Sequence, residues 1–229
     1  MSYIIGPANK DDSEAGKLLK GEFPVTKVDT VDEYIFWRFN VELQLTPYEQ
    51  KIKYAINDEF NPDFQFFIPA VDQSMNTMSY SCNGFSINVD VDEFPGCLWL
   101  DVLRKHDQLH YHVMLGGGDQ IYCDAIKFVS KEFEKWLKHK RPHNMLTPEL
   151  DASFKEFYLN HYMEWFGVGF NITSNGNANQ PCYPIALHQI PQVNIFDDHD
   201  IIDGFGSYKD KTMSQPVFMG LATFQIRVC

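Results

Sequence analysis

The sequence predicts a layered α/β domain with a partly parallel central sheet, preceded by a small antiparallel β module. Between residues 28 and 70, short aromatic runs alternate apolar and polar positions, which is typical of antiparallel strands that bury one face. After residue 70, strand-like and helix-like segments follow one another along the chain. This order favours a sheet with helices packed on its faces.

The β module is predicted from three runs, EYIFWRFNVELQLT, QKIKYAIN and FQFFIPA. The last two are separated by turn-prone residues in the stretch NDEFNPDF. Residues 1–27 are mixed in character and rich in Gly, Lys and Asp, so we expect them to form a leader segment. The predicted organisation is therefore a leader at 1–27, a β module at 28–70 and an α/β domain at 71–229.

The elements of the α/β domain are predicted from their periodicity and end signals. NTMSY, YHVML and PQVNIF are strand-like, and LWLDVLRKHDQL and AIKFVSKEFEKWLKHK carry apolar residues at helical spacing. A third helix opens with Thr147 as N-cap and Pro148 at its first position. The polar stretch NITSNGNANQPCYP is expected to be a loop.

Composition and charge exclude several classes of protein. The 229 residues include 31 acidic and 19 basic ones, for a formal net charge of -12, which argues against a nucleic-acid-binding surface. No apolar run approaches the roughly 20 residues that cross a bilayer, and the N-terminus lacks the apolar core of a secretory signal. The five cysteines have no CxxC spacing, so they predict neither a disulfide framework nor a zinc ribbon. A cytoplasmic location is the default expectation.

Three predicted strands each end in a polar cluster. The clusters are SCN at 81–83, GGGDQIY at 116–122 and DDHD at 197–200. Because ligand sites of open α/β sheets lie beyond the carboxyl ends of the strands, we expect these three clusters to converge. Three adjacent glycines are unfavourable in backbone entropy, so they indicate that something approaches the chain closely at this point.

The chemistry of the three clusters favours a metal centre. Thiolate and phenolate groups suit iron or zinc, and carboxylate oxygens suit calcium, magnesium or manganese. Two metals about 3.5–4 Å apart form the usual arrangement for displacement at phosphorus, with one carboxylate shared between them. Asp119 is the candidate for that shared ligand. Each motif also has a simpler interpretation: a ligand-free turn for GGGD, a solvated acidic turn for DDHD and a buried apolar side chain for Cys82.

Two further histidine-containing stretches were weighed as sites. His110 and His112 lie on one face of a predicted strand, where either a core or a ligand role fits. The stretch HKRPH at 139–143 is interpreted as a solvated basic helix end, with a phosphate contact as the alternative.

The motifs SCNGFS, HVMLGGGDQIYCDAI and FDDHDIIDGFGS, together with LWLDVLRKH, resemble those of PhoD-like phosphatases. The likeness is greatest to the fungal-type branch, in which a β module similar to FWRFNVELQL and KIKYAIN precedes the catalytic domain. This resemblance implies a metallophosphoesterase with an α/β/β/α layered fold. It also implies hydrolysis of phosphomonoesters or phosphodiesters at a centre containing iron and calcium, or another divalent metal.

Specific roles follow from the resemblance. It makes Cys82 and Tyr122 iron ligands, Asp119 the bridging ligand and His199 the catalytic imidazole. Asp198 is the further metal ligand, with Asp197 as the alternative if the alignment shifts by one residue. The residues expected to contact the phosphate group are Asn83, Gly117 and Gly118.

The chain departs from this family in one respect. No histidine follows His199, although metallophosphoesterases complete their site with a later histidine-bearing strand. We therefore expect residues 71–229 to be the N-terminal part of a PhoD-like domain that is shortened at its C-terminus. The main hypothesis is a two-metal phosphoesterase. The alternatives are an inactive relative that serves as a binding or regulatory protein, and a structural iron or calcium site without catalysis.

Overall fold

A computed structural model describes most of the chain. The described residues are 1–9, 19–85, 89, 93, 97–138, 145–168, 170–173, 176–179 and 182–228. They divide into two units, which are described separately here. Unit 1 comprises Met1–Met78, Lys105–Met114 and Ile185–Pro191; unit 2 comprises Ser79–Arg104, Leu115–Pro184 and Gln192–Cys229. Among the described residues, no helix is long and apolar enough to cross a membrane.

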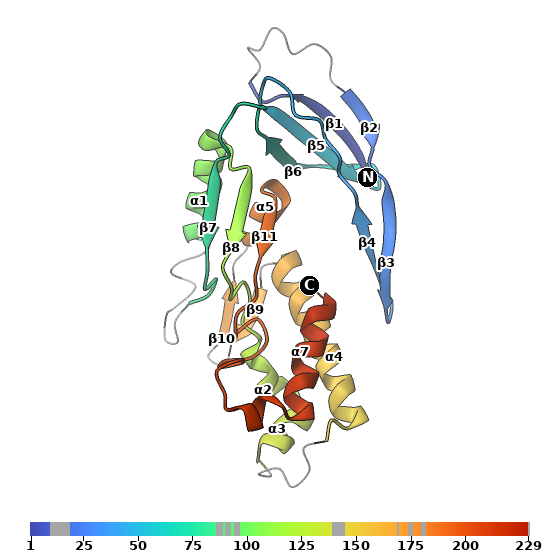
Figure 1. Ribbon diagram of the computed structural model, residues 1–229, viewed down its shortest axis with the longest axis vertical. Helices are drawn as coiled ribbons and strands as arrows, with labels where there is room; N and C mark the ends of the chain where they lie inside the picture. Colours follow the sequence, from blue (N-terminus) through green and yellow to red (C-terminus); the bar gives the residue numbers. More distant parts are fainter. Residues whose placement is uncertain are drawn as a thin grey trace. The chain divides into compact units, whose positions relative to one another are not determined.

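Unit 1 contains a four-stranded antiparallel sheet (Figure 1). Its strands, in spatial order, are β2 (Leu19–Glu22), β1 (Ser2–Pro7), β5 (Gln50–Ile56) and β6 (Glu59–Ile68). In β5, Ile52 and Ala55 are fully buried, and the pairing of β5 with β6 shifts register between Lys53 and Ala55. Asn57 and Asp58 both have positive φ, as the two-residue turn that connects β5 to β6 requires.

A second antiparallel pair in unit 1 is formed by β3 (Val25–Val31) and β4 (Tyr34–Phe39). The predicted strand at 33–46 therefore ends earlier than expected, because residues 40–46 take no strand pairing. The larger difference concerns the expected leader at 1–27. Ser2–Pro7 pairs with both β2 and β5, so the β module includes the N-terminal segment; residues 10–18 lie outside the described part.

The three strand-like runs of the α/β region form one sheet, in the order β11 (Gln192–Asn194), β8 (Val113–Gly116) and β7 (Thr77–Tyr80). Within unit 2, the Gly117 N–H donates to the Tyr80 carbonyl and the Ile195 N–H to the Gly116 carbonyl. Within unit 1, the His112 N–H donates to the Asn76 carbonyl. From His112 to Gly117 the accepting carbonyl moves from Asn76 to Tyr80, so residue numbers rise together along β8 and β7. This is the pattern of parallel strands. The α/β character is thus confirmed, while the four-layer arrangement stays a prediction.

The helices are α1 (Cys97–Leu109), the 3-10 helix η2 (Cys123–Ala125), α2 (Ile126–Val129), α3 (Lys131–Lys138), α4 (Pro148–Val168), α5 (Cys182–Gln189), α6 (Asp210–Met213) and α7 (Pro216–Val228). They include the three that were predicted, and α5, α6 and α7 were not expected from the sequence. The predicted helix from Ala125 is split at Ser130, whose backbone is extended and whose hydroxyl accepts the Phe133 N–H. The expected loop at 171–184 instead contains β9 (Phe170–Thr173), β10 (Gly176–Asn179) and the start of α5.

Helix α4 organises the core of unit 2. Its predicted N-cap is confirmed, because the Thr147 hydroxyl accepts the Leu150 N–H at 3.3 Å. Phe154, Tyr158 and Trp165 are fully buried and pack in a cluster that includes Ile201. The core therefore reaches the segment that follows β11, where the third polar cluster lies.

Candidate metal centre

The three polar clusters meet in unit 2, beyond the ends of their strands. The Cys82 N–H donates to the Gly118 carbonyl at 3.1 Å, and the Asn83 N–H donates to the Asp119 carbonyl at 2.8 Å. The third cluster joins them through the His199 N–H, which donates to Oδ1 of Asp119 at 3.3 Å. Three segments far apart in the sequence thus build one site, and the second and third of them are joined by a bond between residues 80 positions apart.

The glycines permit a close approach by the third cluster. Gly118 has φ of +108°, and a Cβ added there would lie 2.5 Å from the Cβ of Asp197. Asp119, the next residue, also has a positive φ, which is unusual outside glycine. Gly117 differs from Gly118, because it is exposed and an added Cβ would meet nothing closer than 3.4 Å. Gly118 therefore accommodates Asp197, whereas Gly117 presents open backbone.

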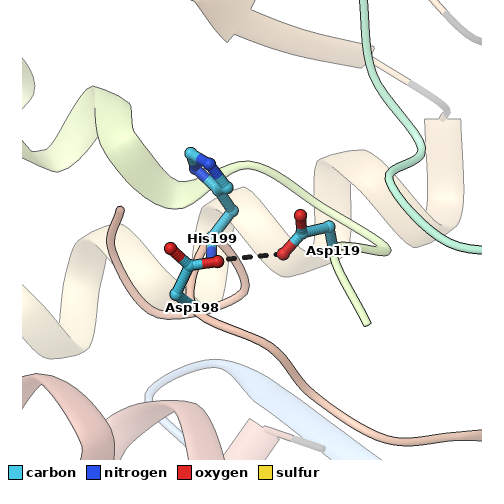
Figure 2. Close-up of side chains that lie close together, drawn as sticks. All are labelled: Asp119, Asp198 and His199. Atoms are coloured by element: carbon cyan, nitrogen blue, oxygen red, sulfur yellow. Dashed lines mark hydrogen bonds between the residues drawn. The ribbon is translucent and has the colours of Figure 1, made fainter. Parts of the chain in front are cut away.

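Asp119, Asp198 and His199 bring possible metal ligands together (Figure 2). One donor atom from each lies within 4.8 Å of the others. Asp119 is buried, and Oδ2 of Asp198 accepts the Gly204 N–H at 2.6 Å. The imidazole of His199 extends away from the two carboxylates in Figure 2. The chemistry of the three groups fits a hard or borderline cation.

The other two predicted ligands also lie beside Asp119. Cys82 is exposed, and its thiol hydrogen-bonds to the Asp119 carboxylate. Tyr122 is half-buried, with its ring centroid 4.7 Å from that of His199. Burial, together with the charge of Asp119, raises the pKa of Tyr122 well above its usual value. A cation at this position would favour the phenolate form, so both side chains suit a metal-ligand role.

The side chain of Asn83 is hydrogen-bonded within the protein. Its side chain is buried, its Nδ2 donates to the Gln120 carbonyl at 3.1 Å, and its Oδ1 accepts the Trp99 indole N–H at 2.7 Å. A phosphate contact by Asn83 stays a prediction, and these two bonds show that its amide is engaged within the protein. Its amide holds the first cluster against the second.

His199 is held by a residue that the sequence analysis did not single out. Its Nδ1 lies 2.5 Å from Oδ2 of Asp124, and Oδ1 of Asp124 accepts the Asp203 N–H and a hydrogen bond from Lys127. Burial alone would lower the pKa of His199, but the hydrogen bond to Asp124 and the neighbouring carboxylates outweigh it and raise the pKa. Asp124 lies within the motif HVMLGGGDQIYCDAI, but nothing in the sequence identifies His199 as its partner.

Carboxylates crowd this part of the chain. Those of the site and its surroundings are Asp119, Asp124, Asp197, Asp198 and Asp200. Burial raises the pKa of Asp119; the nearby His199 counteracts this, and Asp198 and Asp197 add to it. A bound cation would relieve this repulsion, so the electrostatics agree with the donor chemistry.

A comparison with protein families identifies the family to which these motifs belong. The model of the family described as PhoD related phosphatase matches residues 44–228, which is most of the chain. The chain belongs to this family. All three polar clusters lie inside the matched range, and the resemblance expected from them is confirmed.

Two individual proteins are similar to this member of the PhoD related phosphatases. Uncharacterized protein YGR266W of Saccharomyces cerevisiae is 38% identical over 237 residues, covering 99% of this chain and 34% of its own length. The chain therefore spans about a third of that relative. A solved structure described as PhoD matches with a TM-score of 0.48 and 11% identity, covering 99% of this chain and 37% of the other.

Proposed function

We propose that this chain forms the metal-binding part of a phosphoesterase that hydrolyses phosphomonoesters or phosphodiesters at a two-metal centre. The observation that carries the proposal is the group of Asp119, Asp198 and His199, whose donor atoms lie within 4.8 Å of one another. Membership of the PhoD related phosphatases supports the phosphatase chemistry.

The residues present fit iron and a harder cation such as calcium. Cys82 and Tyr122 would bind the iron through sulfur and phenolate oxygen, and Asp119 would be shared between both ions. Asp198 would complete the side of the harder cation, with Asp197 as the alternative ligand. When bound, the ions supply positive charge to the phosphate oxygens and lower the pKa of a water molecule.

The chain's own groups have two further tasks. His199, whose Nδ1 is held by the hydrogen bond to Asp124, would give a proton to the leaving oxygen. The exposed backbone at Gly117 leaves space for a phosphoryl group. Because carboxylates dominate the site, an anionic ester would approach only after cations neutralise them.

Metal analysis and hydrolysis of aryl phosphates test the proposal. The purified chain should contain or take up iron and a divalent cation, and should hydrolyse an aryl phosphate diester or monoester. Asp119→Asn should reduce turnover by about 100-fold or more, since it removes the shared ligand. Asp203→Asn is the control, because Asp203 is exposed and its side chain contacts only Lys127 among the described pairs, at 3.7 Å. Absence of both metal uptake and turnover would refute the proposal.

A second candidate function follows from the fact that the chain matches only part of its yeast relative. The chain spans 34% of the yeast protein, so residues that complete a catalytic site in longer relatives could lie outside the matched part. In that case the chain would bind metal and phosphate without turnover. Inorganic phosphate that binds the metal-loaded chain, with no hydrolysis of any aryl phosphate, would favour this second function.

A further inference from the structure

One buried carboxylate connects two of the three polar clusters. Oδ2 of Asp200 accepts the N–H of Asp119 at 2.7 Å and the N–H of Asp197 at 2.9 Å. Its Oδ1 accepts the N–H of Ile121 at 3.2 Å. The side chain is buried, with the residue only 2% exposed. A single carboxylate thus satisfies three backbone donors from segments about 80 residues apart.

The backbone of the same residue is fixed to the core. The Tyr162 hydroxyl donates to the Asp200 carbonyl at 2.8 Å, and the Tyr158 hydroxyl donates to the next carbonyl, that of Ile201, at 2.6 Å. Both tyrosines belong to α4 and are buried. Asp200 therefore links the candidate site to the aromatic core that contains Tyr158 and Tyr162.

Asp200 is placed to orient ligands rather than to be one. Both of its oxygens are directed at backbone N–H groups. Among the described residues, the group that could hold an ion consists of Asp119, Asp198 and His199, without Asp200. Three converging N–H donors need an acceptor with two oxygens, which only a carboxylate offers, and a buried donor without a partner is unfavourable.

We propose that Asp200 is a positioning residue that sets the backbone geometry of Asp119 and of the Asp197–Asp198 pair, and thereby the affinity of the site for metal. The consequence for metal affinity rests on the proposed function. Groups that hydrogen-bond to the ligand-bearing segments of metal sites affect affinity without touching the ion. The positive φ of Asp119 is maintained by its N–H bond to Asp200, because that conformation is otherwise unfavourable.

The first experiment measures backbone hydrogen exchange in the intact, metal-free chain. Asp200→Asn keeps the shape but leaves one oxygen for three donors. We expect the amides of Asp119, Ile121 and Asp197 to exchange at least about tenfold faster than in the wild-type chain. The Cys123 amide, which donates to the His199 carbonyl, serves as an internal reference and should change little. Unchanged exchange at all three amides would overturn the proposal.

The second experiment measures Mn²⁺ binding by calorimetry or electron paramagnetic resonance. Asp200→Asn should weaken binding by about 10- to 100-fold, as for other groups that orient metal ligands. Asp203→Asn removes the same charge three residues away from an exposed position and should change affinity by less than about threefold. Equal losses in the two variants would show an effect of charge alone and would overturn the positioning role.

Two further results would also bear on the proposal. If Asp200→Asn fails to fold, Tyr162→Phe replaces it; the loss of its bond to the Asp200 carbonyl should weaken Mn²⁺ binding in the same direction, and unaltered binding would count against the proposal. If the wild-type chain binds no Mn²⁺, the proposed function fails. Faster exchange of the three amides in Asp200→Asn would still support the positioning role.

Discussion

The molecule contains two clusters of histidine and carboxylate that differ in how their charges are balanced. In unit 1, the Glu49 carboxylate accepts hydrogen bonds from both histidines of the predicted strand, with His110 Nδ1 at 2.6 Å and His112 Nε2 at 2.9 Å. In unit 2, the carboxylates around Asp119 outnumber the cationic side chains and bond largely to backbone N–H groups. The Glu49 carboxylate therefore has side-chain partners in both histidines, whereas the carboxylates around Asp119 rely largely on backbone N–H groups.

The tautomer of His112 also distinguishes the cluster in unit 1 from a metal site. The Asn76 N–H donates to Nδ1 of His112, so its Nε2 carries the proton and donates to Glu49. A metal-binding histidine also donates one ring N–H to an acceptor, but its other nitrogen is available to the ion, whereas Nδ1 of His112 already accepts the Asn76 N–H. His110 is further held by stacking on Phe67, with ring centroids 3.8 Å apart and planes 7° from parallel. The core role considered for these histidines therefore fits better than the ligand role.

The largest effect on stability is expected from a substitution that fills the space at Gly118. Gly118→Ala would combine an unfavourable φ with a Cβ 2.5 Å from that of Asp197, so we expect a loss of about 2–4 kcal/mol in the free energy of unfolding. Metal uptake should fall with it. Gly167→Ala in α4 meets nothing within 4 Å and should be neutral or slightly stabilising. Urea titration of both variants measures the difference; equal stabilities would show that the close approach at Gly118 does not matter.

A smaller effect is expected from Glu49→Gln, which places an amide where two histidine N–H groups need an anionic acceptor. Unfolding should become easier by about 1–3 kcal/mol, while the Mn²⁺ affinity of unit 2 should stay unchanged. Glu132→Gln removes an exposed carboxylate paired with Lys135 and should change stability by less than about 1 kcal/mol. A weakened Mn²⁺ affinity in Glu49→Gln would contradict the separation of the two clusters.

The smallest effect concerns the pH dependence of unit 1. Burial, together with the neighbouring His110, lowers the pKa of His106 to about 4. Because the unfolded chain titrates near 6.5, it takes up the proton first, and stability should fall as the pH decreases from about 6.5 towards 4. Between pH 7 and pH 5 the loss should be on the order of 1 kcal/mol. His106→Gln should reduce this loss, as measured by thermal unfolding at both values; an identical loss would rule out His106 as its source.

Much of the site was readable from the sequence because its ligands follow strands directly. Strand periodicity located the runs before Cys82, Asp119 and Asp197, and strand ends of a partly parallel sheet lie at one edge. The convergence of the three clusters needed no further information. The glycines also had a local signal, although only the structure shows that Asp197 is what approaches Gly118.

Other features depended on partners far away in the sequence. Ser2–Pro7 has no strong strand pattern, yet it lies between β2 and β5 because both neighbours offer free backbone groups. Asn83 seemed available to a ligand until Trp99 and Gln120 occupied both ends of its amide. No local pattern distinguishes such a residue from one that faces solvent.

By itself, the sequence determined the α/β class, the family motifs and the identity of the candidate ligands, because periodicity and short polar clusters are local properties. Only the tertiary structure decided which carboxylates are buried against backbone donors and which lie beside other possible metal ligands. Asp198 and Asp200 are two residues apart and chemically identical, but Asp198 lies with the donors of Asp119 and His199, whereas Asp200 is buried against three backbone N–H groups. The role of a carboxylate is set by the donors that surround it, and these arrive from segments that only folding brings together.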